Sequence, residues 1–444
     1  MKIKFFGAVG RVTGSSSLLQ GSGGDLLVDM GMFQGGKGDE EMNWVVPKID
    51  GSKLTGMVLT HAHLDHCGRL PTLLSLGYKG KFYMTKATRD LMEIVLLDTV
   101  KIAESNERGL YSGGDVEQVL ARVRTVGFGE VVRVGGMKIR LVKAGHILGS
   151  ASLVVKDEKE RKTVVFSGDL GTGESPLIND PVVPEKADLV VMESTYGNRL
   201  HEDVNEEETL EREMRKVMRN KGALLVPTFS IQRTQRVLYR LGVLSRQGRI
   251  PRGMKVYLDS PMAIRATRVF RKNAGLYSSE MRGKLKGADP FNFPELVVTE
   301  KGWESKKISK NDGAKMIVAG SGMMTGGRIL SHAKRYLGRK STIVFFVGYQ
   351  AEGSLGRKIL EGAKRVRIDG KEIVVKAGVS EVSSMSAHAD QKQLLDWLRG
   401  IRGVKKVVLN HGENEAREVL AGKIRGEMKG VSVVMPGFEE EVKF

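Results

Sequence analysis

A run of four potential metal ligands is the feature that most restricts how this chain folds. The segment His61-Ala62-His63-Leu64-Asp65-His66 directly follows the apolar stretch Met57-Val58-Leu59-Thr60, whose pattern predicts a buried strand. Imidazole and carboxylate groups this dense, on a loop leaving a strand, can surround two metal ions when other segments complete the ligand sets. The single cysteine, Cys67, matches no zinc-ribbon spacing, so a metal site must rest on histidine and aspartate.

Other ligand-type side chains also stand at the ends of apolar segments. They are Asp29, His146, Asp169 and His411. Taken singly, each is equally well a turn or capping residue. Together with the histidine cluster, they predict that several strands of a sheet end at one common rim that carries the metal ligands.

The length and the pattern of predicted elements indicate two α/β domains. A chain of 444 residues is long for one hydrophobic core. After Tyr196 the pattern changes to alternating strands and helices, which is typical of a parallel sheet. The predicted strands are 2–6, 17–20, 26–29, 57–60, 82–84, 138–142, 153–155, 163–167, 189–193, 223–227, 255–259, 315–319, 342–347, 406–409 and 432–435, and the predicted helices are 87–105, 114–125, 206–220, 328–337 and 391–398.

The charge is strongly positive and concentrated in one segment. The net charge is +19, with 71 Lys and Arg against 52 Asp and Glu. Residues 198–384 hold 37 of these basic residues and 19 of the acidic ones, so nearly all the excess lies there. A charged thermophile surface is the alternative, but such surfaces enrich both signs. The excess of one sign favours a polyanionic partner.

The spacing His61-x-His63-x-Asp65-His66, with the residues at the other strand ends, resembles the metallo-β-lactamase superfamily. The resemblance implies a four-layer αββα fold and two zinc ions, although manganese and iron suit the same ligand types. The implied ligands are His61, His63 and His146 for one ion, Asp65, His66 and His411 for the other, and Asp169 for both. Asp29 resembles the superfamily's carboxylate that orients a ligand.

Three further motifs resemble the signatures of the β-CASP nucleases within that superfamily. They are Glu193-Ser194-Thr195-Tyr196-Gly197, Ser386-Ala387-His388-Ala389-Asp390 and Asn410-His411-Gly412-Glu413. In that family an α/β domain with a mainly parallel sheet is inserted between the first motif and the second. The expected domains are therefore 1–197 and 385–444, forming the metallo-β-lactamase domain, and 198–384, forming the insert.

The resemblance also indicates how the site would work. A metal pair would activate water for attack on phosphorus, leaving 5′-phosphate and 3′-hydroxyl ends. His388 lies outside the ligand set and is the expected proton donor to the leaving oxygen, while Glu193 would orient its ring and raise its pKa. Asp65 and Asp29 are also expected to be catalytic residues, together with His388 and Glu193.

Loops of the basic segment are candidates for binding phosphate. Small residues stand where a strand meets a predicted helix in 226–233, 320–328 and 348–356, and backbone N–H groups at such turns suit an anion. The expected substrate contacts are Ser230, Arg233, Ser321, Gly322, Arg328, His332 and Ser386. The alternatives are that the glycines merely permit close packing and that His332 is structural.

The function that fits these features is a zinc-dependent ribonuclease that hydrolyses phosphodiester bonds, with endonuclease and 5′–3′ exonuclease action both open. His411 stands where the DNA-repair branch usually has an aliphatic residue, which favours RNA. The alternatives are a DNA-acting relative, a hydrolase of a small thioester, which the basic insert disfavours, and a nucleic-acid-binding protein with structural zinc.

Single-stranded RNA is the expected partner, and the sequence leaves open whether the chain forms a homodimer. With no signal peptide and no run of about 18 apolar residues, a cytoplasmic protein without membrane contact is expected.

Overall fold

The computed structural model describes residues 1–105, 107–173, 175–202, 204–285, 287–311, 313–382 and 385–444. Within them the chain forms two compact units, residues 1–200 with 388–444 and residues 201–387. The motifs predict domain boundaries after 197 and after 384, and each of these lies three residues before the corresponding boundary of the compact units, after 200 and after 387. Residue 384 itself lies outside the described residues.

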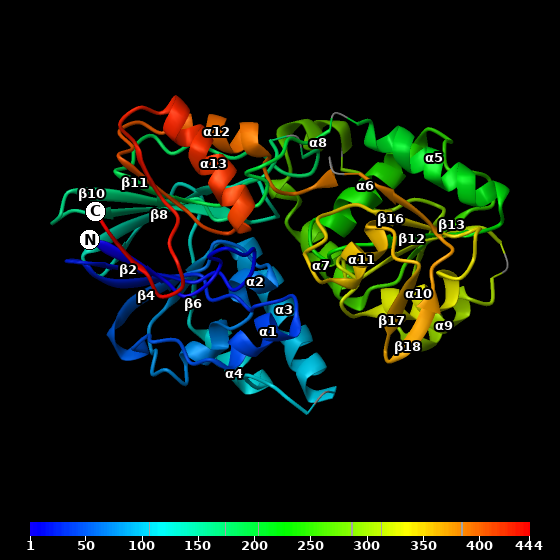
Figure 1. Cartoon of the computed structure of the whole chain (residues 1–444), viewed down its shortest axis with the longest axis horizontal. Helices are drawn as coiled ribbons and strands as arrows, with labels where there is room; N and C mark the ends of the chain where they lie inside the picture. Colours follow the sequence, from blue (N-terminus) through cyan, green and yellow to red (C-terminus); the bar gives the residue numbers. More distant parts are fainter. Residues whose placement is uncertain (106, 174, 203, 286, 312, 383–384) are drawn as a thin grey trace. The chain divides into compact units, whose positions relative to one another are not determined.

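The first unit contains two seven-stranded sheets. One has the order β22 (Glu441–Lys443), β1 (Lys2–Phe5), β2 (Ser17–Gly21), β3 (Gly24–Val28), β4 (Leu54–Val58), β5 (Phe82–Met84) and β6 (Val123–Thr125). The other has the order β21 (Ser432–Val434), β20 (Lys406–Leu409), β11 (Leu189–Met192), β10 (Lys162–Phe166), β9 (Ala151–Asp157), β8 (Met137–Lys143) and β7 (Val131–Val134). The two ends of the chain lie side by side, because β22 pairs antiparallel with β1 (Figure 1).

Each of these sheets changes from antiparallel to parallel pairing partway across. In the first sheet, β3, β4, β5 and β6 run parallel, and in the second, β10, β11, β20 and β21 do. The carboxyl ends of neighbouring parallel strands meet at one edge. This arrangement produces the common rim that the sequence predicts.

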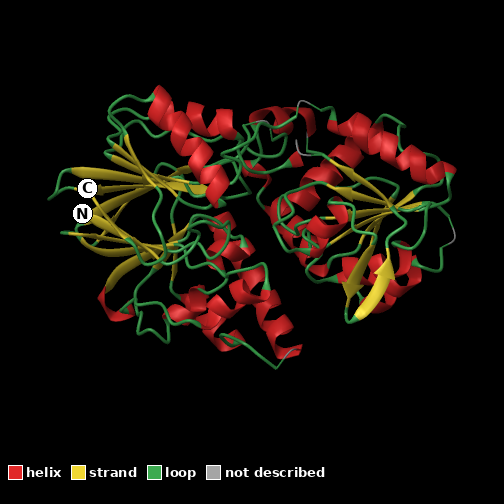
Figure 2. Ribbon diagram, in the orientation of Figure 1, coloured by secondary structure: helices red, strands yellow, loops and turns green. Residues whose placement is uncertain are grey.

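The strands of the second sheet are apolar on both faces because both faces are covered. In β10, Val164 and Phe166 pack into the core between the two sheets, whereas Val165 packs on the opposite face under Leu394 and Leu398. This alternation explains why β10 and β11 are continuous apolar runs. Figure 2 shows the resulting layers, with helices outside both sheets. The expected αββα architecture is confirmed.

The helices of this unit are α1 (Lys37–Glu41), α2 (Leu64–Cys67), α3 (Lys86–Ser105), α4 (Gly113–Ala121), α12 (Gln391–Arg399) and α13 (Asn414–Glu427), and its 3₁₀ turns are Met42–Trp44, Gly51–Lys53 and Leu70–Leu73. One prediction was wrong here, since the helix expected over 114–125 ends at Ala121. Residues Val123–Thr125 instead form β6, where the β-branched side chains pair with β5 in the sheet.

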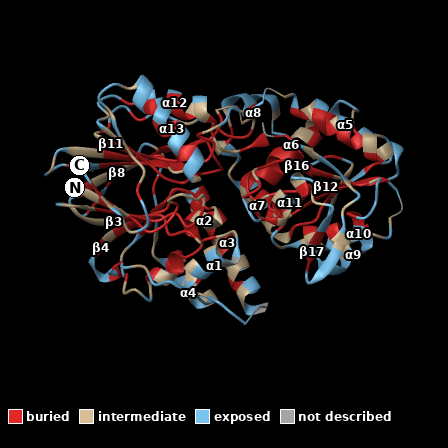
Figure 3. Cartoon of the chain, in the orientation of Figure 1, coloured by how far each residue is buried: buried red, intermediate tan, exposed pale blue. Residues whose placement is uncertain are grey.

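The second unit is built on a six-stranded, wholly parallel sheet. Its order is β14 (Leu296–Val298), β13 (Lys255–Leu258), β15 (Lys315–Ala319), β12 (Ala223–Pro227), β16 (Ile343–Phe346) and β19 (Gly378–Glu381). A separate hairpin joins β17 (Arg365–Ile368) to β18 (Lys371–Val374). The central strands β12 and β16 are almost wholly buried (Figure 3), so the expected parallel insert is confirmed.

Helices follow the strands of this sheet in alternation. They are α5 (Glu206–Arg219), α6 (Arg233–Arg246), α7 (Pro261–Lys272), α8 (Ser279–Leu285), α9 (Gly302–Ile308), α10 (Arg328–Tyr336) and α11 (Leu355–Leu360), with a 3₁₀ turn at Ala274–Leu276. None of the helices in the described parts of the chain is long and apolar enough to cross a membrane.

Candidate metal centre

Strand ends of both sheets of the first unit bring the predicted ligands together. Asp29 follows β3, Asp169 follows β10 and His411 follows β20, all at the carboxyl ends of parallel strands. Asp29 and His411 leave their strands in the left-handed region, with φ of 59° and 46°. Such backbone conformations are uncommon for residues with a side chain and often mark functional constraint.

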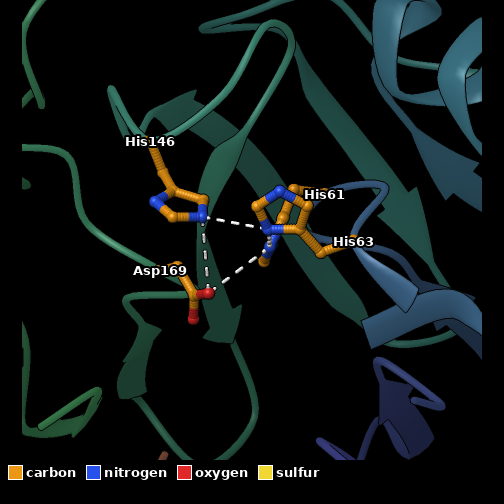
Figure 4. Close-up of side chains that lie close together, drawn as sticks. All are labelled: His61, His63, His146 and Asp169. Atoms are coloured by element: carbon orange, nitrogen blue, oxygen red, sulfur yellow. Dashed lines mark hydrogen bonds and ion pairs between the residues drawn. The ribbon is translucent and has the colours of Figure 1, made fainter. Parts of the chain in front are cut away.

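Three histidines and one aspartate form the first cluster (Figure 4). The Nδ1 atom of His63 lies 3.2 Å from Nε2 of His61 and 3.1 Å from Nε2 of His146. The Oδ2 atom of Asp169 lies 3.4 Å from Nε2 of His61 and 3.6 Å from Nε2 of His146. A tetrahedral metal with bonds of about 2.0–2.1 Å holds its ligand atoms about 3.3–3.4 Å apart, so this spacing suits one ion.

A second cluster is formed by Asp65, His66 and His411. Nε2 of His66 and Nε2 of His411 are 3.1 Å apart, and Oδ2 of Asp65 is 3.3 Å from Nε2 of His411. In each cluster the candidate ligand atoms all lie within 4.8 Å of one another. The structure therefore divides the seven predicted ligands into two sets.

Asp169 faces both sets with different oxygen atoms. Its Oδ2 is directed to His61 and His146, whereas its Oδ1 lies 3.3 Å from Nε2 of His66 and 3.6 Å from Nδ1 of His411. The side chain is 1% exposed, and neither oxygen accepts a hydrogen bond within the described residues. A buried carboxylate without donors is costly, so this position fits a group that holds two cations.

Burial and neighbouring charges prepare these side chains for metal binding. Burial lowers the pKa of His61 and His146, and it lowers the pKa of His63 to about 3, so all three rings are neutral and keep a lone pair at pH 7. For His66 burial opposes the charged form, yet Asp169 and Asp29 raise its pKa well above the usual value. A metal ion at the second cluster would therefore have to displace the Nε2 proton of His66, and the same carboxylates that hold this proton would attract the ion.

Asp29 orients the ring of His66 and is itself held by Thr60. Its Oδ2 lies 2.7 Å from Nδ1 of His66 and accepts from the Thr60 hydroxyl at 2.8 Å, while Oδ1 accepts from the Thr60 N–H at 2.8 Å. This bond places the His66 proton on Nδ1 and leaves Nε2 directed at the second cluster. The orienting position expected for Asp29 matches this geometry.

Sequence reasoning missed two threonines that support ligands. Besides Asp29, the Thr60 hydroxyl contacts Nδ1 of His61 at 3.1 Å, and the Thr195 hydroxyl lies 3.2 Å from Nδ1 of His411. A polar residue ending the apolar strand directly before His61 was the signal for Thr60. Thr195 lies in the first β-CASP motif, but only the fold shows which ring it contacts.

His388 lies beside the first cluster and contacts Glu193. Its Nδ1 is 3.1 Å from Oε2 of Glu193 and 3.9 Å from Oδ2 of Asp169. Glu193 is 1% exposed and also accepts a hydrogen bond from the Leu170 N–H. Burial works against protonation of His388, but Glu193 and Asp169 raise its pKa above the usual value. The ring is 17% exposed, so it combines a proton with access to solvent.

The predicted substrate contacts of the second unit gather at the carboxyl ends of its parallel strands. The hydroxyl of Ser230, after β12, lies 3.3 Å from that of Ser260, after β13. Ser321, after β15, accepts N–H bonds from Thr325 and Gly326. A Cβ atom on Gly322 would lie 2.6 Å from the Phe229 ring, so this glycine permits close packing, which is the alternative role given above.

Three further predicted contacts are largely buried or internally bonded. Arg233 is 6% exposed, and Ser386 is 1% exposed, with its carbonyl accepting from Arg236. Arg328 donates from Nη1 to Asp259 at 2.7 Å and from Nη2 to the Glu300 carbonyl at 2.8 Å. The end of β13 thus places a carboxylate against the Arg328 guanidinium, and a phosphate contact at Arg328 stays a prediction.

Asp259 is a buried carboxylate that sequence reasoning did not single out. It is wholly buried and also contacts His332 Nε2 at 2.7 Å, Thr299 Oγ1 at 2.8 Å and Ser305 Oγ at 2.6 Å. Although burial opposes it, these donors lower the pKa of Asp259 to about 2. The contact favours the structural alternative given for His332. The sequence pattern that could have indicated Asp259 is the same as for Asp29, namely an aspartate at the end of an apolar strand.

Comparisons with known families and proteins agree with this geometry. Residues 9–228 match the metallo-beta-lactamase superfamily, residues 234–359 the Beta-Casp domain, and residues 372–436 the Zn-dependent metallo-hydrolase RNA specificity domain. The chain is 41% identical, over the full length of both chains, to Ribonuclease TTHA0252 of Thermus thermophilus. It is 31% identical to RNase aCSPSF2 of Saccharolobus solfataricus, covering 98% of this chain and 83% of the relative.

Two further similarities extend the comparison. The chain is 30% identical to transcription termination factor FttA of Methanocaldococcus jannaschii, covering 93% of this chain and 67% of the relative. A crystal structure described as a protein of unknown function from Enterococcus faecalis V583 shares the fold, with a TM-score of 0.56, 12% identity and 99% of both chains covered. The chain therefore belongs to the β-CASP family of the metallo-β-lactamase superfamily.

Proposed function

We propose that this chain is a metal-dependent ribonuclease that hydrolyses RNA phosphodiester bonds with two zinc ions, one in each cluster. The observation that carries the proposal is Asp169, a buried carboxylate whose two oxygens face two different sets of imidazoles. A structural zinc site closes its shell with four protein ligands that serve one ion. Here Asp169 faces both sets, and Asp65 of the second set is partly exposed, so a paired site of this kind would leave room for water, which favours catalysis over a purely structural role.

Ions held in these clusters would supply an activated water near neutral pH and electrostatic stabilisation of a phosphate under attack. The protein's own residues do the remaining work. Asp29 fixes the tautomer of His66 so that Nε2 stays available. Asp65 Oδ2 lies 3.9 Å from Nε2 of His66 and 3.3 Å from Nε2 of His411 and would complete the second ligand set.

His388 would act as the general acid. Its pKa is raised by Glu193 and Asp169, so more of it carries a proton near neutral pH than a free histidine would. Its Nδ1 is held by Glu193, which leaves the other ring nitrogen to donate to the departing 3′ oxygen. Attack by water with departure of that oxygen leaves 5′-phosphate and 3′-hydroxyl ends.

RNA is the substrate best supported by the charge and the relatives. The basic excess of the second segment suits a polyanion, and several relatives are named as ribonucleases. Residues 372–436 match a domain described by RNA specificity. We expect single-stranded RNA to be preferred.

The decisive experiment combines metal analysis with cleavage of end-labelled RNA. Purified protein should contain about two metal ions per chain and should cleave single-stranded RNA faster than duplex RNA or DNA. His388→Ala should keep both ions while the cleavage rate falls by about 10²- to 10⁴-fold. Full activity after complete metal removal, or loss of metal from the His388 variant, would contradict these assignments.

A further inference from the structure

One face of helix α9 presents an aromatic ring and three lysines to solvent. Trp303, Lys306, Lys307 and Lys310 are all exposed, Trp303 to 54%. They stand at i, i+3, i+4 and i+7, so they share one side of the helix and its continuation. We call these four residues the α9 stripe.

The opposite face of α9 is fixed to the body of the second unit. Ser305 donates to the buried carboxylate of Asp259, and Ile308 is 1% exposed in the hydrophobic core. The same carboxylate is held by Arg328 and His332. The stripe is therefore presented by a rigid support, and its exposed tryptophan is not part of a loosely packed segment.

No carboxylate in the described part of the chain neutralises the three lysines of the stripe. Of the nearest acidic residues in sequence, Glu300 pairs with Arg268 and Glu304 accepts the N–H of Lys301, while Asp312 lies outside the described residues. Lys301 is a fourth exposed basic residue at the start of the helix. The stripe thus combines concentrated positive charge with an exposed aromatic surface.

We propose that the α9 stripe binds single-stranded RNA, with a base stacking on Trp303 and the lysines contacting successive phosphates. The choice of RNA rests on the function proposed above. Lys307 Nζ lies 4.4 Å from the Trp303 ring centroid, a cation–π contact that stiffens the ring and places a charge beside any base stacked on it. Aromatic platforms beside basic grooves bind single strands without sequence preference.

The dimensions of the stripe suit a short stretch of one strand. Seven residues of helix span about 10 Å. This length corresponds to about three nucleotides of a stacked strand at about 3.4 Å each. Each lysine can therefore meet a different phosphate while Trp303 takes one base.

Binding is tested on the full-length chain with poly(uridylic acid) as the probe, followed by intrinsic tryptophan fluorescence. RNA should quench the part of the emission that Trp303→Phe removes. Trp303→Ala should weaken binding about tenfold, with Trp303→Phe retaining more of it. Changing the three stripe lysines to Gln should flatten the log–log salt dependence by about 0.7 for each phosphate that the variant no longer neutralises.

A matched variant separates the stripe from total charge. Changing the exposed Lys79, Lys423 and Lys429 to Gln removes the same charge from scattered positions. This variant should bind poly(uridylic acid) with an affinity within about twofold of the wild-type value. The slope of its log–log salt dependence should stay unchanged apart from general screening. Equal reductions of affinity in the two triple variants would overturn the proposal, as would stripe variants that bind poly(uridylic acid) like wild type.

Cleavage kinetics distinguish failure of this inference from failure of the proposed function. For long single-stranded RNA the stripe variants should raise KM and keep kcat. A wild-type chain that binds poly(uridylic acid) through the stripe but cleaves no RNA would sink the proposed function alone. A stripe that binds vesicles of anionic phospholipid but not poly(uridylic acid) would instead identify a membrane contact and refute the inference.

Discussion

Replacing Asp29 by Asn tests whether this carboxylate sets the tautomer of His66. Asp29 accepts three hydrogen bonds with two oxygens, from the Thr60 N–H, the Thr60 hydroxyl and His66 Nδ1. An amide has one oxygen and one NH₂ group, so one of these donors must face the NH₂ group. Either orientation of the asparagine therefore has a defined cost.

The two orientations differ in what they damage. If the amide oxygen faces His66 and the Thr60 hydroxyl, the buried Thr60 N–H loses its acceptor, which costs about 1–3 kcal/mol of stability. If the NH₂ group faces His66, Nδ1 must accept, the proton moves to Nε2, and this atom can no longer bind metal. Outer partners of this kind typically change metal affinity by about 10- to 100-fold.

We therefore expect Asp29→Asn to weaken zinc binding at the second cluster by about that factor, measured by competition with a chromogenic chelator. The control is Asp157→Asn, because Asp157 is equally buried and accepts N–H bonds from Gly23, Lys159 and Glu160. The control should lower the melting temperature and leave zinc affinity unchanged. An Asp29→Asn variant with wild-type zinc affinity and wild-type melting temperature would refute the reasoning.

Three further predictions concern the same site. Asp169→Ala should lower metal content at both clusters, measured by elemental analysis, whereas a loss of one ion only would show that it does not serve both. Glu193→Gln should shift the alkaline limb of the pH–rate profile to lower pH, because burial lowers the pKa of His388 and the carboxylate that raises it is removed; an unchanged limb would exclude His388 as the acid. Cleavage products should carry 5′-phosphate ends by mass spectrometry, and 2′,3′-cyclic phosphates would show instead that the RNA's own hydroxyl attacks.

The metal ligands could be predicted because their chemistry and their position both show in the sequence. Each of Asp29, Asp169 and His411 ends an apolar run, and parallel strands bring such ends to one edge. The assignment to one cluster or the other came from the resemblance, since spacing alone does not say which oxygen of Asp169 faces which ring. The structure adds the supporting bonds of Thr60 and Thr195.

Secondary structure was predicted most accurately for strands filled with buried apolar residues. It was predicted least accurately where pairing with a distant strand determines the conformation. The strands Phe82–Met84, Ala223–Pro227, Lys315–Ala319 and Lys406–Leu409 have the predicted bounds because apolar residues fill most of their positions. The segment 123–125 continues a helical pattern but becomes a strand. Its partner β5 is about forty residues away, and no local signal reports that pairing.

Arg328 and His332 show how far residue type can indicate a role. An arginine after a glycine-rich loop is suited to bind phosphate, and the sequence contains nothing nearby to oppose that interpretation. The opposing residue, Asp259, lies 69 positions away from Arg328 and reaches it only because β13 and β15 are adjacent in the sheet. Whether a cation meets solvent or an internal carboxylate is thus decided by strand order. The lysines of α9, whose helix the same carboxylate anchors through Ser305, remain exposed, so these cations meet solvent where Arg328 meets Asp259.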